Sequence, residues 1–533
     1  MPQDGRDIEE LNTLKRSEIL GFSYLDIRTL TQKPLYPDLI PDSIMREYQV
    51  IPIISTDDRL TIGITTMTPP NILEDLRRIH NKQRIRYVLI SNAALQDYFN
   101  LYHPPIKVIY HDIVLSTDFH DEAAKKVGRA FQDVRAEDML AYLVHQAYRL
   151  EASDIHCEVQ ESSIRIRMRV NGVLYPVVEL EDKYYRILVG AIASAADIST
   201  VAQDSQTGQI KQTQTMTDGL KVDINMRVET VPSIHGMDIV MRFFAFNPSQ
   251  LHLAKLGMNQ KQVEIVNDII QYPRGLVLVV GPTGSGKTTT LYSLLGELNS
   301  DQTKIITLED PVEYQMSGLT QIPIDVHKGA SFAQGLRAVL RLDPDIVMVG
   351  EIRDHDTIST ALRASLTGHL VMSTYHANSA TLAIITILRM ITEDPLMLNA
   401  IRLIQSQRLV RRLDDSTKEA YRPNEMEREQ IKQIVNSMHP ALRPNLKTDF
   451  KLYKPVPSEK NPFGYSGRFA IRELLVLDDQ IRNKLLNEQT TLEANKFEAY
   501  LCHSKQFVTM LQEGILKVLA GQTTLAELYR TGS

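Results

Sequence analysis

Apolar and polar positions in the first hundred residues alternate between helical and strand-like patterns. In VIPIISTDDRLTIGI, two apolar runs flank a polar turn at residues 56–58, which predicts a β-hairpin. Helical patterns lie on both sides of this hairpin, so we expect a small α/β domain over residues 1–103. The periodicity is lost at two consecutive prolines, and residues 104–122 are expected to form a linker.

A second mixed α/β domain is expected over residues 123–245. Apolar residues recur at helical spacing between positions 136 and 150. In the following IRIRMRVNGVL, apolar residues alternate with Arg165, Arg167 and Arg169, which is the period of a strand. The stretches LKVDINMRVETV and MDIVMRFF add a second β region, so the domain should carry arginines on one face of its sheet.

Beyond a short linker at residues 246–258, the pattern changes to one typical of a parallel sheet. The apolar stretches LVLVV, KIITL, IVMVG and HLVMST alternate with helical segments over residues 259–412. Residues 413–533 begin with a charged, proline-bearing stretch and end in helical patterns. We expect an α/β nucleotide-binding domain followed by a mostly helical C-terminal region.

The composition narrows the class of protein. The chain has 533 residues, of which 43% are hydrophobic and 23% charged, so most of it should fold into several domains. A net charge of −6 does not favour nucleic acid as a partner. Two cysteines exclude a disulfide framework, and no apolar run is long enough to span a bilayer. We therefore expect a cytoplasmic protein whose membrane contacts are made through partners.

The sharpest motif is a complete G-x-x-x-x-G-K-T directly after LVLVV and before the helical TTTLYSLLGEL. Backbone N–H groups of such a loop surround phosphate oxygens, while Lys287 reaches the β- and γ-phosphates and Thr288 offers a hydroxyl to Mg²⁺. The flanking strand and helix disfavour the alternative of a flexible Gly/Ser loop. The expected nucleotide-binding residues are Gly281, Pro282, Thr283, Gly284, Ser285, Gly286, Lys287, Thr288 and Thr289.

Carboxylates follow two further predicted strands. The strand IVMV ends in Gly-Glu351, where a carboxylate can hold the Mg²⁺ shell or orient water; alone, this segment would be taken for an acidic surface turn. The strand KIITL is followed by Glu309, Asp310 and Glu313. Strand C-termini of a parallel sheet line one crevice, so these carboxylates can face a nucleotide. Asp310 and Glu313 could instead cap a turn or helix, and for Glu309 the sequence does not separate the two readings.

Two histidines flank the strand LVMST, namely His369 and His376. A histidine at a strand end can sense the γ-phosphate, or it can pack and hydrogen-bond locally. Spacing alone does not decide between these readings.

Taken together, GPTGSGKT, ITLEDPVEY, LRLDPDIVMVGEIRD and TGHLVMSTYHANSA resemble the Walker A, Asp box, Walker B and His box of the secretion ATPase superfamily, in that order. The upstream ASDIHCE and MRVETVPSIHGMDIVMRFF, and the downstream IQSQRLVRRL and GYSGRFAIRELL, are also similar to type II secretion and type IV pilus assembly (GspE/PilB-like) ATPases. The resemblance implies a RecA-like P-loop domain, a preceding PAS-like domain, an extra N-terminal α/β domain and a helical C-terminal region.

The resemblance also implies roles for particular residues. Glu313, the last carboxylate of the Asp box, would be the general base, Glu351 the Walker B carboxylate, and His376 the residue that signals between nucleotide and ring. Arg227 in MRVET and Arg242 in MRFF match arginines that reach the nucleotide at a subunit interface. Without the resemblance, both arginines would be taken for exposed charges on a half-buried strand.

The implied function is that of a homohexameric, Mg²⁺-dependent ATPase that drives pilus assembly or type II secretion. Its partners would be an inner-membrane platform protein and cytoplasmic assembly factors, with the first hundred residues as a docking domain. Retraction motors lack that domain, which favours extension. The alternatives are a retraction or DNA-transfer motor, and a nucleotide-binding scaffold without useful turnover. A helicase-like motor expects a basic channel with stacking aromatics, whereas the chain has no tryptophan.

Two departures from the family pattern, and one pair of cysteines, bear on possible ligands. A tetracysteine zinc site is usual in the assembly branch, but residues 413–463 contain no cysteine, so no zinc is expected. Cys157 and Cys502 each neighbour a histidine, yet adjacent strand residues point to opposite faces and make a shared metal site unfavourable. Gln209 stands where the family commonly has arginine. Some relatives bind a cyclic dinucleotide through the N-terminal domain, and no motif for it is found here.

Overall fold

The structure is a computed structural model of the chain, which divides into two compact units at residues 109 and 110. It describes residues 5–30, 33–102, 113, 115, 131, 134, 138–161, 163–215, 221–243, 252–325, 329–391, 394–447, 449–458, 461–488, 492–504 and 506–532.

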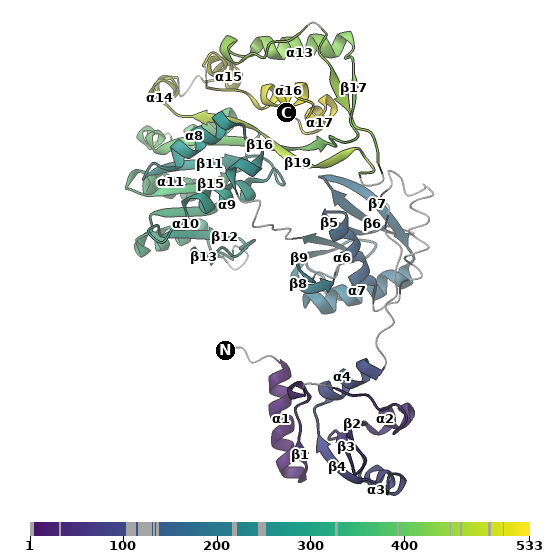
Figure 1. The fold of residues 1–533 in the computed structure, drawn as a ribbon. Helices are drawn as coiled ribbons and strands as arrows, with labels where there is room; N and C mark the ends of the chain where they lie inside the picture. Colours follow the sequence, from purple (N-terminus) through teal and green to yellow (C-terminus); the bar gives the residue numbers. More distant parts are fainter. Residues whose placement is uncertain are drawn as a thin grey trace. The chain divides into compact units, whose positions relative to one another are not determined.

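The N-terminal unit is built on a four-stranded sheet with the order β1-β4-β3-β2 (Figure 1). The predicted hairpin is present, because β2 and β3 pair antiparallel on either side of the polar turn, and its inward-facing isoleucines and leucine are buried. The strands are β1 (Ser23–Tyr24), β2 (Val50–Ser55), β3 (Arg59–Ile64) and β4 (Arg84–Leu89), and the helices are α1 (Gly5–Leu20), α2 (Asp42–Tyr48), α3 (Pro70–Ile79) and α4 (Asn92–Tyr102).

The second unit begins with a six-stranded sheet of order β7-β6-β5-β10-β9-β8. Its apolar residues and those of two helices form one buried core, whereas the alternating arginines of β6 are half-exposed or exposed on the other face. The expected mixed α/β domain with arginines on one face is therefore observed. The strands are β5 (Ala152–Val159), β6 (Ile164–Val170), β7 (Val173–Leu180), β8 (Gln206–Thr215), β9 (Lys221–Pro232) and β10 (Met237–Phe243), and the helices are α6 (Met139–Arg149) and α7 (Asp182–Ala196).

The stretch expected to be a linker lies largely outside the described residues. The two of its residues that are described, Ile113 and Leu115, are buried in the core of the six-stranded sheet. Burial of apolar side chains stabilises this segment against the sheet domain, so at least this part of residues 104–122 belongs to a folded core.

The nucleotide-binding region forms a seven-stranded sheet of order β13-β12-β14-β15-β11-β16-β19. The four predicted strands are all present and pair in parallel, with apolar clusters on both sheet faces. The strands are β11 (Gly275–Val280), β12 (Ile305–Glu309), β13 (Thr320–Pro323), β14 (Ile346–Ile352), β15 (Leu370–Tyr375), β16 (Ile401–Leu413) and β19 (Tyr465–Val476), and the helices are α8 (Gln260–Ile270), α9 (Lys287–Leu298), α10 (Phe332–Val339), α11 (His355–Leu366) and α12 (Ala380–Met390).

The C-terminal region contains the expected helices and also a long strand that the sequence did not predict. Strand β19 pairs antiparallel with β16 and so extends the nucleotide-domain sheet beyond residue 412. Its second part, FAIRELLV, is mostly apolar but does not alternate strictly, and such a short stretch does not distinguish a buried strand from a helix. The remaining elements are β17 (Glu419–Tyr421), β18 (Leu452–Lys454), α13 (Glu425–Ser437), α14 (Asp479–Asn487), α15 (Ala494–Cys502), α16 (Met510–Leu519) and α17 (Leu525–Arg530).

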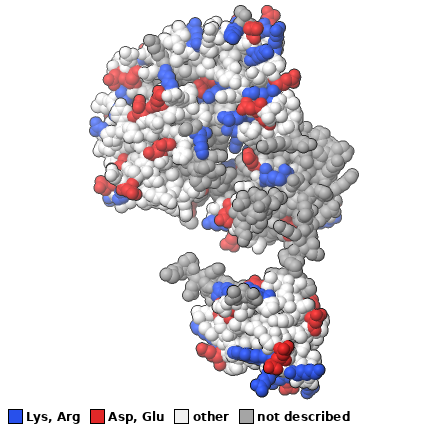
Figure 2. All heavy atoms as spheres, in the orientation of Figure 1, with Lys and Arg blue, Asp and Glu red and all other residues white. Residues whose placement is uncertain are grey.

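On the face drawn in Figure 2, acidic and basic side chains are interspersed over the described parts. Among the described residues, no helix is both long enough and apolar enough to cross a bilayer.

Candidate active site

The P-loop connects the buried strand β11 to helix α9, as its sequence context predicted. Gly281 has φ +152°, and a Cβ there would lie 2.6 Å from Ser285 Oγ and 2.7 Å from the carbonyl oxygen of Gln407, so only glycine fits. Gly286 caps α9 at φ 85°, in the left-handed region. The loop therefore turns sharply into the N-terminus of a helix, which favours bound anions.

Lys287 lies folded back over the loop. Its Nζ donates hydrogen bonds to the carbonyl oxygens of Gly281 at 3.0 Å and Pro282 at 2.9 Å. Burial lowers the pKa of Lys287, while the carboxylate of Glu351 acts in the opposite direction. The ammonium group is thus held at the loop by weak neutral acceptors that a phosphate can replace.

A cavity of about 870 Å³ joins the P-loop to the expected catalytic groups. It is lined by Pro282 to Thr289, the carboxylates Glu309, Asp310, Glu313 and Glu351, and also His376 and Arg242. These residues come from distant parts of the sequence and two different sheets. Arg227 is the one predicted catalytic residue that does not line the cavity.

The two outer Asp-box carboxylates have different surroundings. Glu309 is buried, and its carboxylate accepts hydrogen bonds from the hydroxyls of Tyr292 at 2.5 Å and Thr307 at 2.6 Å. Glu313 faces the P-loop and interacts with the Thr288 hydroxyl. Desolvation, followed by the negative charge of Glu309, raises the pKa of Glu313. Glu309 is therefore held in place by the core, whereas Glu313 is open to the cavity.

Glu351 and His376 are in contact. The Glu351 carboxylate pairs with the Arg353 guanidinium, and its Oε2 lies 3.5 Å from His376 Nε2. The Walker B strand end and the His box are thus joined directly. His369 is at the other end of β15, where its Nδ1 lies 3.1 Å from the carbonyl oxygen of Ala364, so the local-packing reading fits His369.

The two arginines expected at the nucleotide lie side by side on β9 and β10. Arg242 lines the cavity of its own chain, and its Nε lies 2.8 Å from Asp154 Oδ1. Arg227 lies one strand further from the cavity than Arg242, and it pairs with Glu229 at 2.5 Å. Gln209 is opposite Arg227 on β8. The arrival of Arg242 across a subunit boundary stays a prediction, since the structure contains a single chain.

Strand β16 supplies residues that the sequence reasoning missed. Gln407 Nε2 donates to the P-loop carbonyl of Ser285 at 2.8 Å, and Gln407 Oε1 accepts from the Thr290 hydroxyl at 3.0 Å. Arg408 lines the cavity and donates to the carbonyl oxygen of Asn378, just after the His box, at 2.9 Å. The signal for them was present in the IQSQRLVRRL stretch, which forms most of β16 and pairs in parallel with β11.

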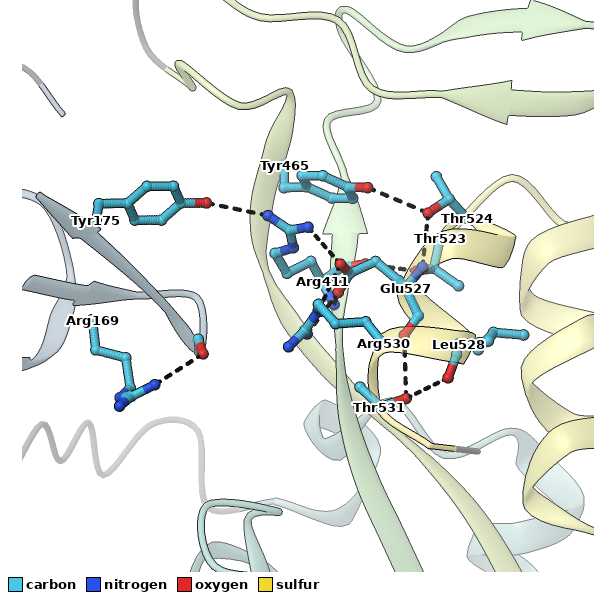
Figure 3. Close-up of polar contacts among 11 residues, drawn as sticks. Arg169, Tyr175, Arg411, Tyr465, Thr523, Thr524, Glu527, Leu528, Arg530 and Thr531 are labelled. Atoms are coloured by element: carbon cyan, nitrogen blue, oxygen red, sulfur yellow. Dashed lines mark hydrogen bonds and ion pairs between the residues drawn. The ribbon is translucent and has the colours of Figure 1, made fainter. Parts of the chain in front are cut away.

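The second sheet, β16 and the C-terminal helix α17 meet at Arg411 (Figure 3). Arg411 donates to the Tyr175 hydroxyl at 3.2 Å and to Glu527 at 2.5 Å, and its guanidinium lies 4.0 Å from the centre of the Tyr465 ring. Burial alone would raise the pKa of Glu527, but the hydrogen bonds from Arg530 and Arg411 lower it to about 2. Arg530 also lines the cavity, so α17 is linked to the nucleotide site.

The cavity offers suitable ligands for Mg²⁺. The hydroxyl of Thr288 and the carboxylates of Glu313 and Glu351 all face it, and Mg²⁺ prefers such oxygen ligands. Cys157 is buried, and burial raises the pKa of its thiol to about 12, which opposes metal binding. Within the described ranges, no group of three or more His, Cys, Asp or Glu side chains is arranged to hold a metal ion. The expected lack of zinc stays a prediction.

Comparisons with known proteins cover almost the whole chain. The family model for Type II/IV secretion system protein matches residues 131–530, and that for the MshEN domain matches residues 20–107. Type II secretion system protein E of Xanthomonas campestris is 33% identical over 526 residues, which are 96% of this chain and 89% of that protein. The type IV pilus assembly ATPase PilB of Myxococcus xanthus is 32% identical over 524 residues, again 96% and 89% of the two chains.

Among solved structures, the ATPase DotB of Legionella pneumophila has the same fold. It matches with a TM-score of 0.54 and 22% identity, over 75% of this chain and 97% of that one. The likeness supports the predicted multidomain α/β fold with a P-loop domain.

Proposed function

This chain belongs to the type II/IV secretion system protein family, and from that premise we propose that it is a Mg²⁺-dependent ATPase that powers type IV pilus assembly or type II secretion. Relatives named type II secretion system protein E and type IV pilus assembly ATPase PilB both match across 96% of the chain. We propose further that it works as a homohexameric ring and pushes against a platform protein of the membrane, together with cytoplasmic assembly factors.

The observation that carries the proposal is the cavity at the P-loop. One cavity holds the P-loop lysine, carboxylates from two strand ends, the His-box histidine and an arginine from a second sheet. A scaffold that merely binds nucleotide needs the loop but not the converging carboxylates, so this arrangement favours hydrolysis.

The residues suit distinct steps of hydrolysis. Lys287 would contact the β- and γ-phosphates and Thr288 and Glu351 would hold Mg²⁺, which when bound neutralises charge on the phosphate oxygens. Glu313 would accept the proton of the attacking water, and its raised pKa suits a base working near neutral pH. Arg242 would stabilise charge that develops on the transferred phosphoryl group.

The contacts around the cavity suggest how hydrolysis is coupled to motion. Arg242 reaches the cavity from one sheet, and Glu351 and His376 reach it from another, so a γ-phosphate bound between them would be contacted from both sheets. We propose that a relative movement of the two sheets is the mechanical output of the ring. The N-terminal unit, which the MshEN model matches, would dock to the machinery.

The proposal is tested by Lys287→Ala, measured as phosphate release together with binding of a fluorescent ATP analogue. Loss of the lysine charge should lower turnover by at least about 100-fold. The matched control is Lys496→Ala, because Lys496 is exposed on α15, pairs with Glu493 and is not among the residues that line the cavity. Near-normal hydrolysis by Lys287→Ala would refute the site, and hydrolysis absent from the unmodified protein in its assembled state would favour the scaffold alternative.

A further inference from the structure

A row of polar residues crosses five strands of the six-stranded sheet at one level. Strand pairing places Gln209 opposite Arg227, Arg227 opposite Arg242, Arg242 opposite Asp154, and Asp154 opposite Arg169. Because cross-strand partners point to the same face, all five side chains share one face. The row therefore contains three arginines, and the single carboxylate in it stands between two of them.

Asp154 is almost fully enclosed by its neighbours. Its side chain is 6% exposed, its Oδ1 lies 2.8 Å from Arg242 Nε, and its Oδ2 lies 3.5 Å from Arg169 Nε. The hydroxyl of Ser153 donates to Oδ2 at 2.8 Å. By contrast, the side chains of Arg242 and Arg169 are 59% and 34% exposed, and both line the cavity that contains the P-loop.

This geometry leaves the two arginines oriented and still able to bind an anion. A buried carboxylate needs paired charges, so Asp154 holds the arginines firmly in place. It engages each of them through Nε. One terminal nitrogen of Arg169 also donates a hydrogen bond to the carbonyl oxygen of Gly172 at 3.3 Å (Figure 3). A guanidinium has five N–H donors, so the planar ends retain donors for phosphate oxygens.

The charges in the row also favour an anion. Arg227, directly opposite Arg242, is paired with a carboxylate of its own, Glu229. One carboxylate cannot neutralise both Arg242 and Arg169, so this part of the cavity lining keeps a positive charge, whereas the other carboxylates of the lining come from the other sheet. A polyphosphate between the P-loop and this row would be attracted to that charge.

We propose that Asp154 is a positioning residue for ATP hydrolysis, which fixes Arg242 and Arg169 as a pair facing the phosphates of the nucleotide. The proposal rests on the ATPase function proposed above. It assigns Arg169 to the nucleotide site as well, and it makes the second sheet supply two oriented guanidiniums in place of one.

The test is Asp154→Asn, which keeps the shape of the side chain and removes its charge. Misplaced arginines should lower kcat by about 10- to 100-fold. KM should not rise, because loss of a negative charge makes the cavity more attractive to ATP. Asp154→Glu should restore part of kcat. The matched control is Glu158→Gln on the same strand, because Glu158 pairs with Arg167 and is not among the cavity-lining residues.

A double-mutant cycle separates positioning from general support of the sheet. If Asp154 acts through Arg242, the loss in Asp154→Asn/Arg242→Gln should be smaller than the product of the two single losses. Thermal unfolding checks each variant. If Asp154→Asn does not fold, Arg169→Gln carries the test: kcat should fall, and KM should rise because a positive charge that faces the phosphates is lost.

Several results would overturn the proposal. The first is an unchanged kcat in Asp154→Asn or in Arg169→Gln. The second is a double variant whose kcat is reduced by the product of the two single reductions. The third is a reduction of kcat in Glu158→Gln as large as that in Asp154→Asn. None of these results bears on the ATPase function itself, which fails only if Lys287→Ala remains active or the unmodified protein does not hydrolyse ATP.

Discussion

At the scale of single residues, the Asp box contains one carboxylate that is fixed in the core and one that we propose to be the general base. Glu309 is buried and receives two short hydroxyl hydrogen bonds, whereas Glu313 is four residues further on and faces the P-loop. The fixed charge of Glu309 is one of the causes that raise the pKa of Glu313. A base with a raised pKa accepts a proton more readily from the attacking water.

Glu313→Gln should bind ATP as well as the unmodified protein and hydrolyse it about 10²- to 10⁴-fold more slowly, since an amide cannot take up the proton. Phosphate release and titration with an ATP analogue measure the two effects separately. Glu264→Gln on α8 is the control, because Glu264 is exposed. A variant that loses binding and unfolds would show instead that Glu313 is structural.

The sequence predicted those site residues whose positions follow from local motifs. The P-loop is one continuous stretch between a strand and a helix. Glu313, Glu351 and His376 lie at or shortly after strand C-termini that meet at one edge of a parallel sheet. Asp154 and Gln407 escaped prediction because their roles depend on register between strands that are distant in sequence. No local pattern carries that information.

At the scale of elements, one carboxylate on β19 joins two helices. Glu473 accepts hydrogen bonds from the backbone N–H of Ala380 and, at 3.2 Å, of Met510, the first residues of α12 and α16. Helix α12 directly follows the His box. Burial raises the pKa of Glu473 to about 7, although both hydrogen bonds and Arg408 oppose the change.

This pKa predicts a pH dependence of stability. Because the folded-state value of about 7 is above the reference value of 4.5, the folded state binds the proton more tightly, and stability should fall between pH 4.5 and pH 7. At about 1.4 kcal/mol per pKa unit, the contribution is roughly 3 kcal/mol. Glu473→Gln lacks this pH-dependent contribution to stability, because an amide does not titrate.

Thermal unfolding of the unmodified protein and Glu473→Gln at pH 5 to 8 checks the prediction. The unmodified protein should lose its advantage over the variant as the pH rises. Glu493→Gln, which alters an exposed carboxylate on the surface, should show a constant difference at every pH. A constant difference for Glu473→Gln as well would mean that Glu473 does not titrate in this range.

Elements with a clear period were predicted, and β19 was not. The β2–β3 hairpin, the alternating strand β6 and the four parallel strands around the P-loop each have a pattern that fits one type of structure. The second half of β19 is buried on both faces, where α12 and α16 pack near it. Its position in the sheet therefore depends on tertiary packing, which the period of apolar residues along the sequence does not report.

At the scale of the whole molecule, the origin of the arginine is the open question in the proposed ring. The family resemblance suggests supply across a subunit boundary, whereas Arg242 lines the cavity of its own chain in this structure. Mixed rings of Arg242→Ala and Lys287→Ala subunits distinguish the two. If the arginine acts within its own chain, every subunit has an incomplete site, and mixtures should stay at the low activity of the parents.

Subunit exchange must be demonstrated in the same samples, for example by fluorescence energy transfer between labelled subunits. Activity in exchanged rings that exceeds both parents would show that some sites combine a sound P-loop from one subunit with a sound arginine from another. That result would place the working arginine of each site on a neighbour.

The antiparallel pairing of β19 with β16 has a consequence for dividing the chain into fragments. A fragment cut after residue 412, where the alternation of strands and helices ends, would contain the whole P-loop motif but leave β16 without its outer neighbour. A strand with unpaired backbone groups along its edge can pair with another chain, which favours self-association. The ATPase domain and the C-terminal region are thus not separable modules. A chimera with a related protein should fold only when residues 259 to 532 are exchanged as one block.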